Sequence, residues 1–143
     1  MQTRIVVIAL TLVLAASGCQ TSGGAPDDGM TLTGLSPAAA SAIAGDLSAR
    51  LAEQAPPTDT VIELTSDRAE FGVALEAALK GWGYRVNPDL PAKKAVKLDY
   101  AIGQSDGGIL ASVAMPSVVL SRTYLASASG AAPEGPLSVL RRD

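Results

Sequence analysis

The segment from Val96 to Met115 constrains the fold more than any other part of the sequence. Between its two halves stands Ser105-Asp106-Gly107-Gly108, and an Asp-Gly pair can supply the positive φ angles of a tight hairpin turn. Such a segment predicts two antiparallel strands with one apolar face that other elements must cover. The apolar residues at every second position are Val96, Leu98, Tyr100 and Ile102 before the turn, and Ile109, Ala111, Val113 and Met115 after it.

Two further segments have apolar residues at helical spacing and are predicted to cover that face. The first begins at Ser36-Pro37, an N-cap residue followed by the proline that suits the first helical position. The second is expected to begin at Asp67, with Glu70 completing a capping box three residues later. The apolar stripes are Ala39, Ile43, Leu47 and Leu51 in the first helix and Phe71, Leu75, Ala78, Leu79 and Trp82 in the second, with Asp46, Ser48, Arg50 and Glu53 on the polar side of the first.

Short β-branched or alternating segments predict the rest of the sheet, at residues 60–65, 84–86 and 118–129. Pro116 suggests a strand edge or a bulge, and residues 130–135 are predicted to form a loop. The strand–helix–strand order of residues 60–86 favours a parallel crossover. We therefore expect an α+β fold in residues 35–143, with two helices packed on one face of a mixed, mostly antiparallel sheet in a two-layer sandwich.

The first eighteen residues have the features of a signal peptide. A positive charge at Arg4 precedes the apolar run 5–16, which is too short for the roughly 20 residues of a spanning helix. The run ends in Ala16-Ser17-Gly18-Cys19, which resembles a bacterial lipobox, although Ala16 stands where that pattern prefers Leu or Val. We therefore expect residues 1–18 to be a lipoprotein signal peptide and Cys19 to be the lipidation site. Ordinary secretion with an unpaired thiol is the alternative.

Residues 19–34 are predicted to form a lipidated N-terminus and a flexible linker, because they are rich in Gly, Ser, Thr and Asp. Stable anchoring requires more than one acyl chain, and a lipoprotein cysteine carries two or three. The residue after Cys19 is Gln20, which resembles the default signal for transfer to the outer membrane. The predicted location is the outer membrane, with the small domain of residues 35–143 lipid-anchored and facing the periplasm.

The residues that are missing restrict the chemistry. The chain has no histidine and one cysteine, so the usual zinc, copper and haem ligands and an intramolecular disulfide are excluded. No pair of carboxylates has support as a general acid and base, so we predict no catalytic residue, no metal site, no cofactor and no enzymatic activity. A net charge of −3 with scattered signs argues against nucleic-acid binding.

Two segments are candidates for contact with a ligand or a partner. Gly81-Trp82-Gly83-Tyr84 either closes the core at a helix end, the favoured interpretation, or offers a stacking platform for a sugar or a base. The segment 136–143 contains three apolar residues near its end. It is either tucked onto its own sheet, which is favoured, or offered to another chain as an added strand. The possible partner contacts are Leu137, Val139 and Leu140.

The chain as a whole resembles the TrbH family of conjugal-transfer lipoproteins, which belong to mating-pair-formation systems of the type IV secretion class. The resemblance rests on the segment ending at Cys19 and on the stretches 32–54, 71–84 and 116–140. It implies a non-enzymatic subunit of the envelope-spanning channel that tethers or stabilises periplasmic channel subunits. Its partners would be the membrane, through the N-terminal lipid, and other channel subunits, with no small-molecule substrate. A regulatory or ligand-binding lipoprotein that contacts peptidoglycan or its synthases is the alternative.

Overall fold

The computed structural model describes residues 35–65, 69–86 and 95–143. The predicted signal peptide, Cys19, the linker and Asp67 therefore lie outside the described residues. The described chain forms two α-helices, a short 3₁₀ turn (η1) and seven strands. In chain order these are α1 (Pro37–Gln54), η1 (Pro57–Asp59), β1 (Val61–Leu64), α2 (Glu70–Gly81), β2 (Arg85–Val86), β3 (Ala95–Ser105), β4 (Gly108–Met115), β5 (Val118–Ser127), β6 (Gly130–Pro133) and β7 (Ser138–Arg141).

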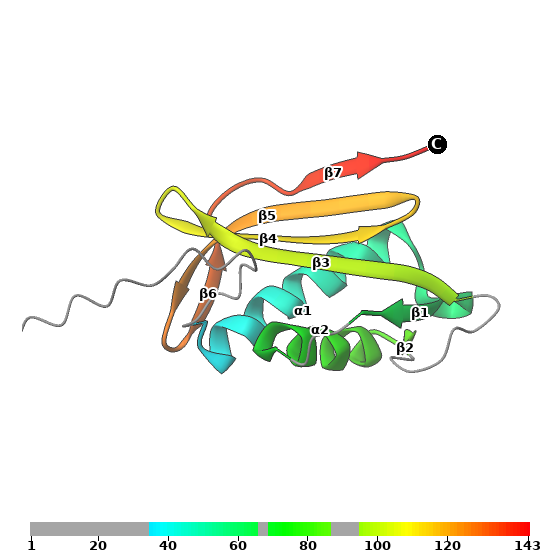
Figure 1. Ribbon diagram of the computed structural model, residues 1–143, viewed down its shortest axis with the longest axis horizontal. Helices are drawn as coiled ribbons and strands as arrows, with labels where there is room; N and C mark the ends of the chain where they lie inside the picture. The colour runs from blue at the N-terminus through cyan, green and yellow to red at the C-terminus, as the bar shows by residue number, and fades with distance from the viewer. Residues whose placement is uncertain (1–34, 66–68, 87–94) are drawn as a thin grey trace, which may run out of the picture.

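The strands form one mixed sheet in the order β2-β1-β3-β4-β5 (Figure 1). β6 and β7 follow one another along the remaining edge of β5, where β7 pairs with the first part of β5 and β6 with the last part. β1 is parallel to β2 and β3, and the other pairings are antiparallel. These pairings confirm the predicted parallel crossover and the mixed, mostly antiparallel sheet.

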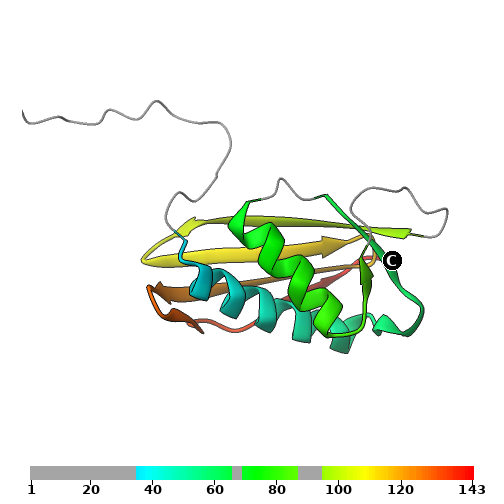
Figure 2. The same ribbon diagram turned by 90° about the horizontal axis from the view of Figure 1, so that it is seen from below.

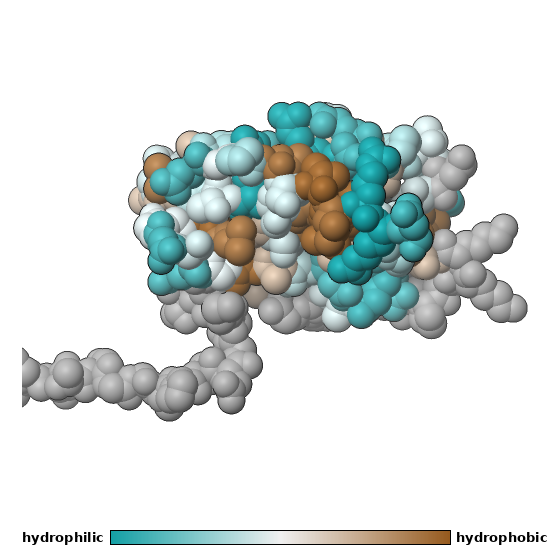
Figure 3. Space-filling view, turned by 90° about the horizontal axis from the view of Figure 1, so that it is seen from above, coloured by the Kyte–Doolittle hydropathy of each residue, from teal (hydrophilic) through white to brown (hydrophobic). Residues whose placement is uncertain are grey.

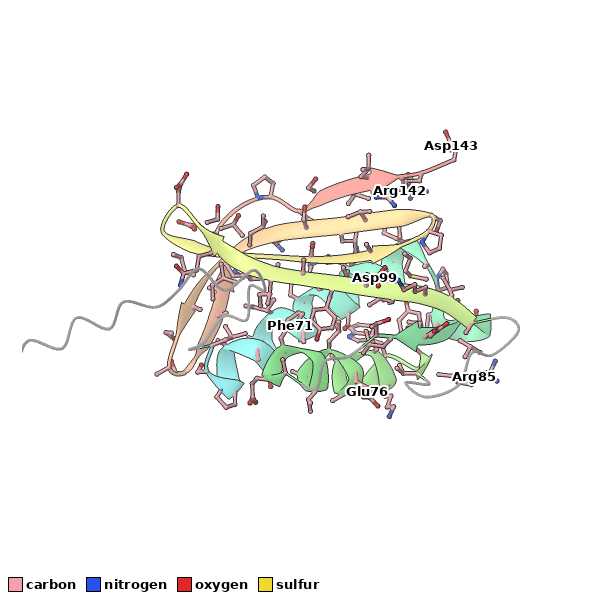
Figure 4. The ribbon with its side chains drawn as sticks, viewed as in Figure 1. Phe71, Glu76, Arg85, Asp99, Arg142 and Asp143 are labelled. Atoms are coloured by element: carbon pink, nitrogen blue, oxygen red, sulfur yellow. The ribbon has the colours of Figure 1, made fainter. Side chains whose placement is uncertain are left out.

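Both helices lie on the same face of the sheet (Figure 2), which confirms the predicted two-layer α+β architecture. The core lies between the layers and consists mainly of aliphatic side chains. Phe71 of α2 reaches the sheet, where its ring meets Tyr100 edge-to-face at 5.3 Å between centroids (Figure 4). The fully buried large side chains include Ile43, Leu47 and Leu51 of α1, Leu75 and Leu79 of α2, and Ile62, Leu64, Leu98, Val113 and Leu120 of the sheet.

The first helix begins as predicted. The Ser36 hydroxyl oxygen accepts a hydrogen bond from the Ala39 N–H at 3.1 Å, and the hydroxyl donates to the Ser127 carbonyl at 2.9 Å. Ala39, Ile43, Leu47 and Leu51 are all buried, which confirms the predicted stripe. Ser48 was predicted to lie on the polar side of this helix, but it is buried. It stands four residues after Ala44 and so continues a buried line of small side chains.

The second helix begins at Glu70, with Ala69 as an N-cap that makes no side-chain capping bond. The predicted start at Asp67 is therefore wrong. At the other end the helix stops at Gly81, and Gly83 follows with a φ of +94°. Trp82 is 50% exposed, so the prediction that it closes the core is also wrong. Tyr84 does this instead: its side chain is buried and its hydroxyl donates a hydrogen bond to the Ala55 carbonyl.

The connections between strands agree only in part with the sequence. The Asp106-Gly107 turn is confirmed, with Gly107 at a φ of +85°. Pro116 marks neither an edge nor a bulge, because it stands in the tight turn that joins β4 to β5. Residues 130–133 were predicted to be a loop but form β6, since their backbone pairs with the end of β5.

Candidate functional site

The candidate partner site is the edge of the sheet formed by β7. The segment lies on its own sheet, in register with β5 at Leu140 opposite Val119 and Val139 opposite Leu120. Leu137 packs against the core, whereas Val139 is 41% and Leu140 is 56% exposed. The favoured interpretation, tucking onto the sheet, therefore holds for the backbone, and two of the three apolar side chains remain accessible to solvent.

The second edge of β7 has no strand beside it among the described residues. The Arg142 N–H donates to the Ser117 carbonyl at 2.9 Å and so points toward β5. Along an antiparallel strand the backbone groups of alternate residues point in opposite directions. The N–H and C=O groups of Val139 and Arg141 therefore point away from β5, in the geometry that another strand requires.

A polar network attaches this edge to α1. Arg122 of β5 donates to the Gly135 carbonyl at 2.8 Å, between β6 and β7, and to the Asp46 carboxylate at 3.2 Å. The Tyr124 hydroxyl donates to the same carboxylate oxygen at 2.8 Å. Burial and the bond to the Asp46 carboxylate raise the pKa of the Tyr124 hydroxyl. At the end of the strand, Arg141 donates to the Gln54 amide oxygen at 2.7 Å.

Sequence reasoning missed this network. The apolar spacing placed Asp46 on the polar side of α1 and suggested no partner for Arg122, yet their side chains are only 20% exposed and pair with each other. The alternation along β5 could have revealed it. Arg122 lies two residues from each of the buried Leu120 and Tyr124, so its side chain is on their face of the sheet.

The other candidate does not form a joint surface. Trp82 is exposed while Tyr84 is buried, so the two rings of the Gly81–Tyr84 segment do not line one stacking platform.

The described residues have surface pockets of about 370 Å³ beside the β3–β4 turn and about 200 Å³ beside β7. They contain no cluster of three or more Cys, Asp or Glu that could hold a metal ion. A pocket of about 200 Å³ beside β7 is smaller than the roughly 300–1,000 Å³ of typical ligand sites. Its lining residues are Gln54, Ser117, Val118, Arg141, Arg142 and Asp143. In the part of the chain that the structure covers, neither helix has the length and hydropathy of a membrane span.

Comparison with known proteins identifies the family. The family model described as conjugal transfer protein TrbH matches residues 21–143. The chain belongs to the TrbH family. It is also similar to the probable conjugal transfer protein TrbH of Sinorhizobium fredii (strain NBRC 101917 / NGR234). The two are 43% identical over 150 residues, which cover 98% of this chain and 99% of the relative. No solved structure matches the chain.

The match confirms the resemblance found in the sequence and includes every described element of the TrbH fold. It therefore includes β7 and the Asp46–Arg122–Tyr124 network, which stand in the matched residues.

Proposed function

We propose that this TrbH protein is a non-catalytic subunit of a conjugative transfer apparatus of the type IV secretion class. In this proposal, acyl chains on Cys19 hold it at the outer membrane, and its domain faces the periplasm. There it binds and stabilises other subunits of the transfer channel. The observation that carries the proposal is the family match over residues 21–143, together with 43% identity to a relative named for conjugal transfer.

The arrangement of the N-terminal residues supports the proposed anchor. Cys19 is the sole cysteine, so it has no partner for an intramolecular disulfide, and it directly follows the small residues Ser17-Gly18. The folded domain begins at α1, and a Gly-rich linker of residues 20–33 has an r.m.s. reach of about 20 Å. The domain is therefore held close to the membrane without being pressed against it.

The contact with the channel is assigned to the β7 edge. Main-chain groups of Val139 and Arg141 can pair with an extended segment of a partner, as in binding by strand addition. Val139 and Leu140 add exposed apolar side chains to that edge. The bonds from Arg122 to Gly135 and from Arg141 to Gln54 hold the edge in place before binding, which limits the entropy lost on association.

Two substitutions test the two parts of this proposal separately, with transfer frequency and membrane fractionation as readouts. Cys19→Ala removes the acylated sulfur, and Ser22→Ala in the linker is its matched control. We expect Cys19→Ala to leave the protein uncleaved or soluble and to abolish transfer, and we expect Ser22→Ala to do neither. Unchanged transfer by Cys19→Ala would show that the anchor is dispensable.

The second substitution is Val139→Pro, which removes an N–H that points away from the sheet. Ala131→Pro in β6 is the matched control, since β6 also lies at an edge and the Ala131 N–H also points away from β5. We expect Val139→Pro, but not Ala131→Pro, to prevent recovery of other transfer proteins with the tagged full chain. Recovery of the same proteins by both variants would refute the assignment to β7.

A further inference from the structure

The side chains along the β7 edge change from apolar to basic in the direction of the chain. Residues paired across neighbouring strands share a face of the sheet. Val139 lies opposite the buried Leu120, so its side chain is on the helix side, and the side chain of Leu140 is on the other side. Both are partly exposed, and the next two residues, Arg141 and Arg142, are exposed as well. Each side of the edge therefore carries one apolar residue followed by one arginine.

The two kinds of surface lie next to each other on the molecule. Figure 3 is seen from the side on which Figure 1 places β7, and it shows apolar surface beside a strongly hydrophilic band toward one end. Figure 4 shows Arg142 and Asp143 at the end where β7 finishes. A segment bound along this edge thus meets apolar and charged groups within a few residues.

Neither arginine forms an ion pair within the part of the chain that the structure describes. The Arg141 guanidinium donates to the Gln54 amide oxygen, which is uncharged, and a guanidinium has several further N–H donors. Arg142 bonds to Ser117 through its backbone N–H alone. Asp143 follows, and no ion pair joins its carboxylate to either arginine among these residues. The charged side chains on the adjoining parts of α1 and β5 are paired with one another, namely Asp46, Arg50, Glu53 and Arg122.

A strand added to β7 would bring its own side chains directly beside these residues, whichever way it runs. The Cβ atoms of directly opposite residues are about 4.5–5.5 Å apart, so apolar pairs and opposite charges stabilise the contact and like charges destabilise it. Two consecutive residues of the added strand would lie beside Val139 and Leu140, and the next two beside Arg141 and Arg142. A guanidinium group binds a carboxylate through two parallel N–H···O bonds, which adds specificity to the attraction.

We propose that the β7 edge binds an extended acidic segment of another protein, in which two consecutive apolar residues adjoin two consecutive Asp or Glu residues. This inference rests on the proposed function, because it names the chemical class of segment that the same edge receives. The main-chain groups of Val139 and Arg141 hold the segment as a strand, and the side chains of the edge select its sequence. A basic segment would place like charges beside Arg141 and Arg142 and is therefore disfavoured.

The opposite edge of the sheet lacks this combination of groups. It is formed by β2, which has only the two residues Arg85–Val86. Val86 packs against the core, and Arg85 is exposed. This edge offers one arginine without adjoining exposed apolar side chains on its strand, so Arg85 provides a matched control for the arginines of β7 (Figure 4).

Fluorescence anisotropy of labelled peptides with the full chain, purified in detergent, tests the class of partner. The acidic probe is Ser-Thr-Val-Val-Glu-Glu-Thr-Ser, and the basic probe has Lys in place of both Glu residues. A second pair of probes, with the four central residues in reverse order, covers the other strand direction. We expect the acidic probe of one pair to bind about tenfold more tightly than its basic counterpart, and Val139→Pro to abolish this binding. Equal affinities within both pairs, or binding that Val139→Pro leaves unchanged, would overturn the proposal.

A charge substitution shows whether the preference arises at β7. Arg142→Glu and Arg85→Glu change the net charge by the same amount, and both replace an exposed arginine. We expect Arg142→Glu to reduce the preference for the acidic probe from about tenfold to about twofold or less, and Arg85→Glu to leave it unchanged. Equal unfolding temperatures of the two variants serve as the folding control. A preference that persists in folded Arg142→Glu protein, or that both variants lose equally, would contradict the assignment to this edge.

The measurements separate failure of this inference from failure of the proposed function. If the edge receives a channel subunit of different chemistry, Val139→Pro still prevents recovery of transfer proteins while the acidic and basic probes bind alike. If the edge has no role in the channel, Val139→Pro leaves that recovery unchanged, whereas the preference for the acidic probe and its loss in Arg142→Glu are still observed.

Discussion

Ser48 offers a direct test of the packing between the helices and the sheet. Its side chain in α1 is fully buried, and its hydroxyl oxygen has no hydrogen-bond partner among the described residues. Leaving a buried polar group unpaired costs about 1–3 kcal/mol. Ser48→Ala removes that group, and alanine has the higher helix propensity by about 0.5 kcal/mol. Part of the gain is offset because the small space left by the oxygen is no longer filled.

We therefore expect Ser48→Ala to raise the free energy of unfolding by about 1–2 kcal/mol and the Tm by roughly 4–8 °C. Urea unfolding followed by circular dichroism measures the first quantity, and a thermal scan measures the second. Ser41→Ala is the matched control, because Ser41 lies in the same helix and is exposed, so it gains only the helix propensity. If Ser48→Ala stabilises the protein no more than Ser41→Ala does, the hydroxyl is not the unpaired group that the structure describes.

Two further predictions concern the tyrosine network and the glycines. Stability should fall as the pH rises above about 10, because the unfolded Tyr124 loses its proton there while the folded hydroxyl, with its raised pKa, keeps it. Urea midpoints at about pH 9 and about pH 11 should differ less in Tyr124→Phe than in the parent, and an equal difference would refute this linkage. Gly45→Ala should stabilise α1 by about 0.5–1 kcal/mol, because an added Cβ meets nothing within 4 Å. Gly108→Ala should destabilise the protein, because its Cβ would lie 2.8 Å from the Tyr124 carbonyl oxygen. Urea unfolding measures both glycine variants, and an unchanged free energy of unfolding for Gly108→Ala would contradict this prediction.

The sequence was sufficient for the elements whose pattern is periodic. The alternation in Val96–Met115 and the Asp-Gly pair predicted β3, β4 and their turn, because a period of two has one regular backbone conformation. The apolar spacing and the Ser36 cap likewise predicted α1, and the fold class followed from the order of these elements.

The sequence was insufficient where long-range pairing decides the structure. β6 consists of Gly130-Ala131-Ala132-Pro133, which has no alternation and no β-branched residue, so only its pairing with the end of β5 makes it a strand. The exposure of Trp82 depends on the residue at which α2 ends, and element boundaries are set by tertiary contacts as much as by sequence. For the same reason, no local pattern linked Asp46 of α1 with Arg122 of β5, which are 76 residues apart.

The positions of the two proposed attachment points constrain how TrbH can act. Ser36, which follows the proposed linker, bonds to Ser127 at the end of β5, whereas Arg141 of β7 bonds to Gln54 in the last turn of α1. An α-helix of 18 residues is about 27 Å long, so the far end of β7 is separated from the linker by about the length of α1. Figure 4 shows Arg142 and Asp143 at this far end of the molecule. If Cys19 is acylated as proposed, an r.m.s. linker reach of about 20 Å added to the length of α1 puts the β7 edge roughly 47 Å from that cysteine when the two lie in line. In the proposed arrangement the acylated Cys19 is the anchor and the domain is a spacer that presents its binding edge to subunits in the periplasm beyond the membrane surface.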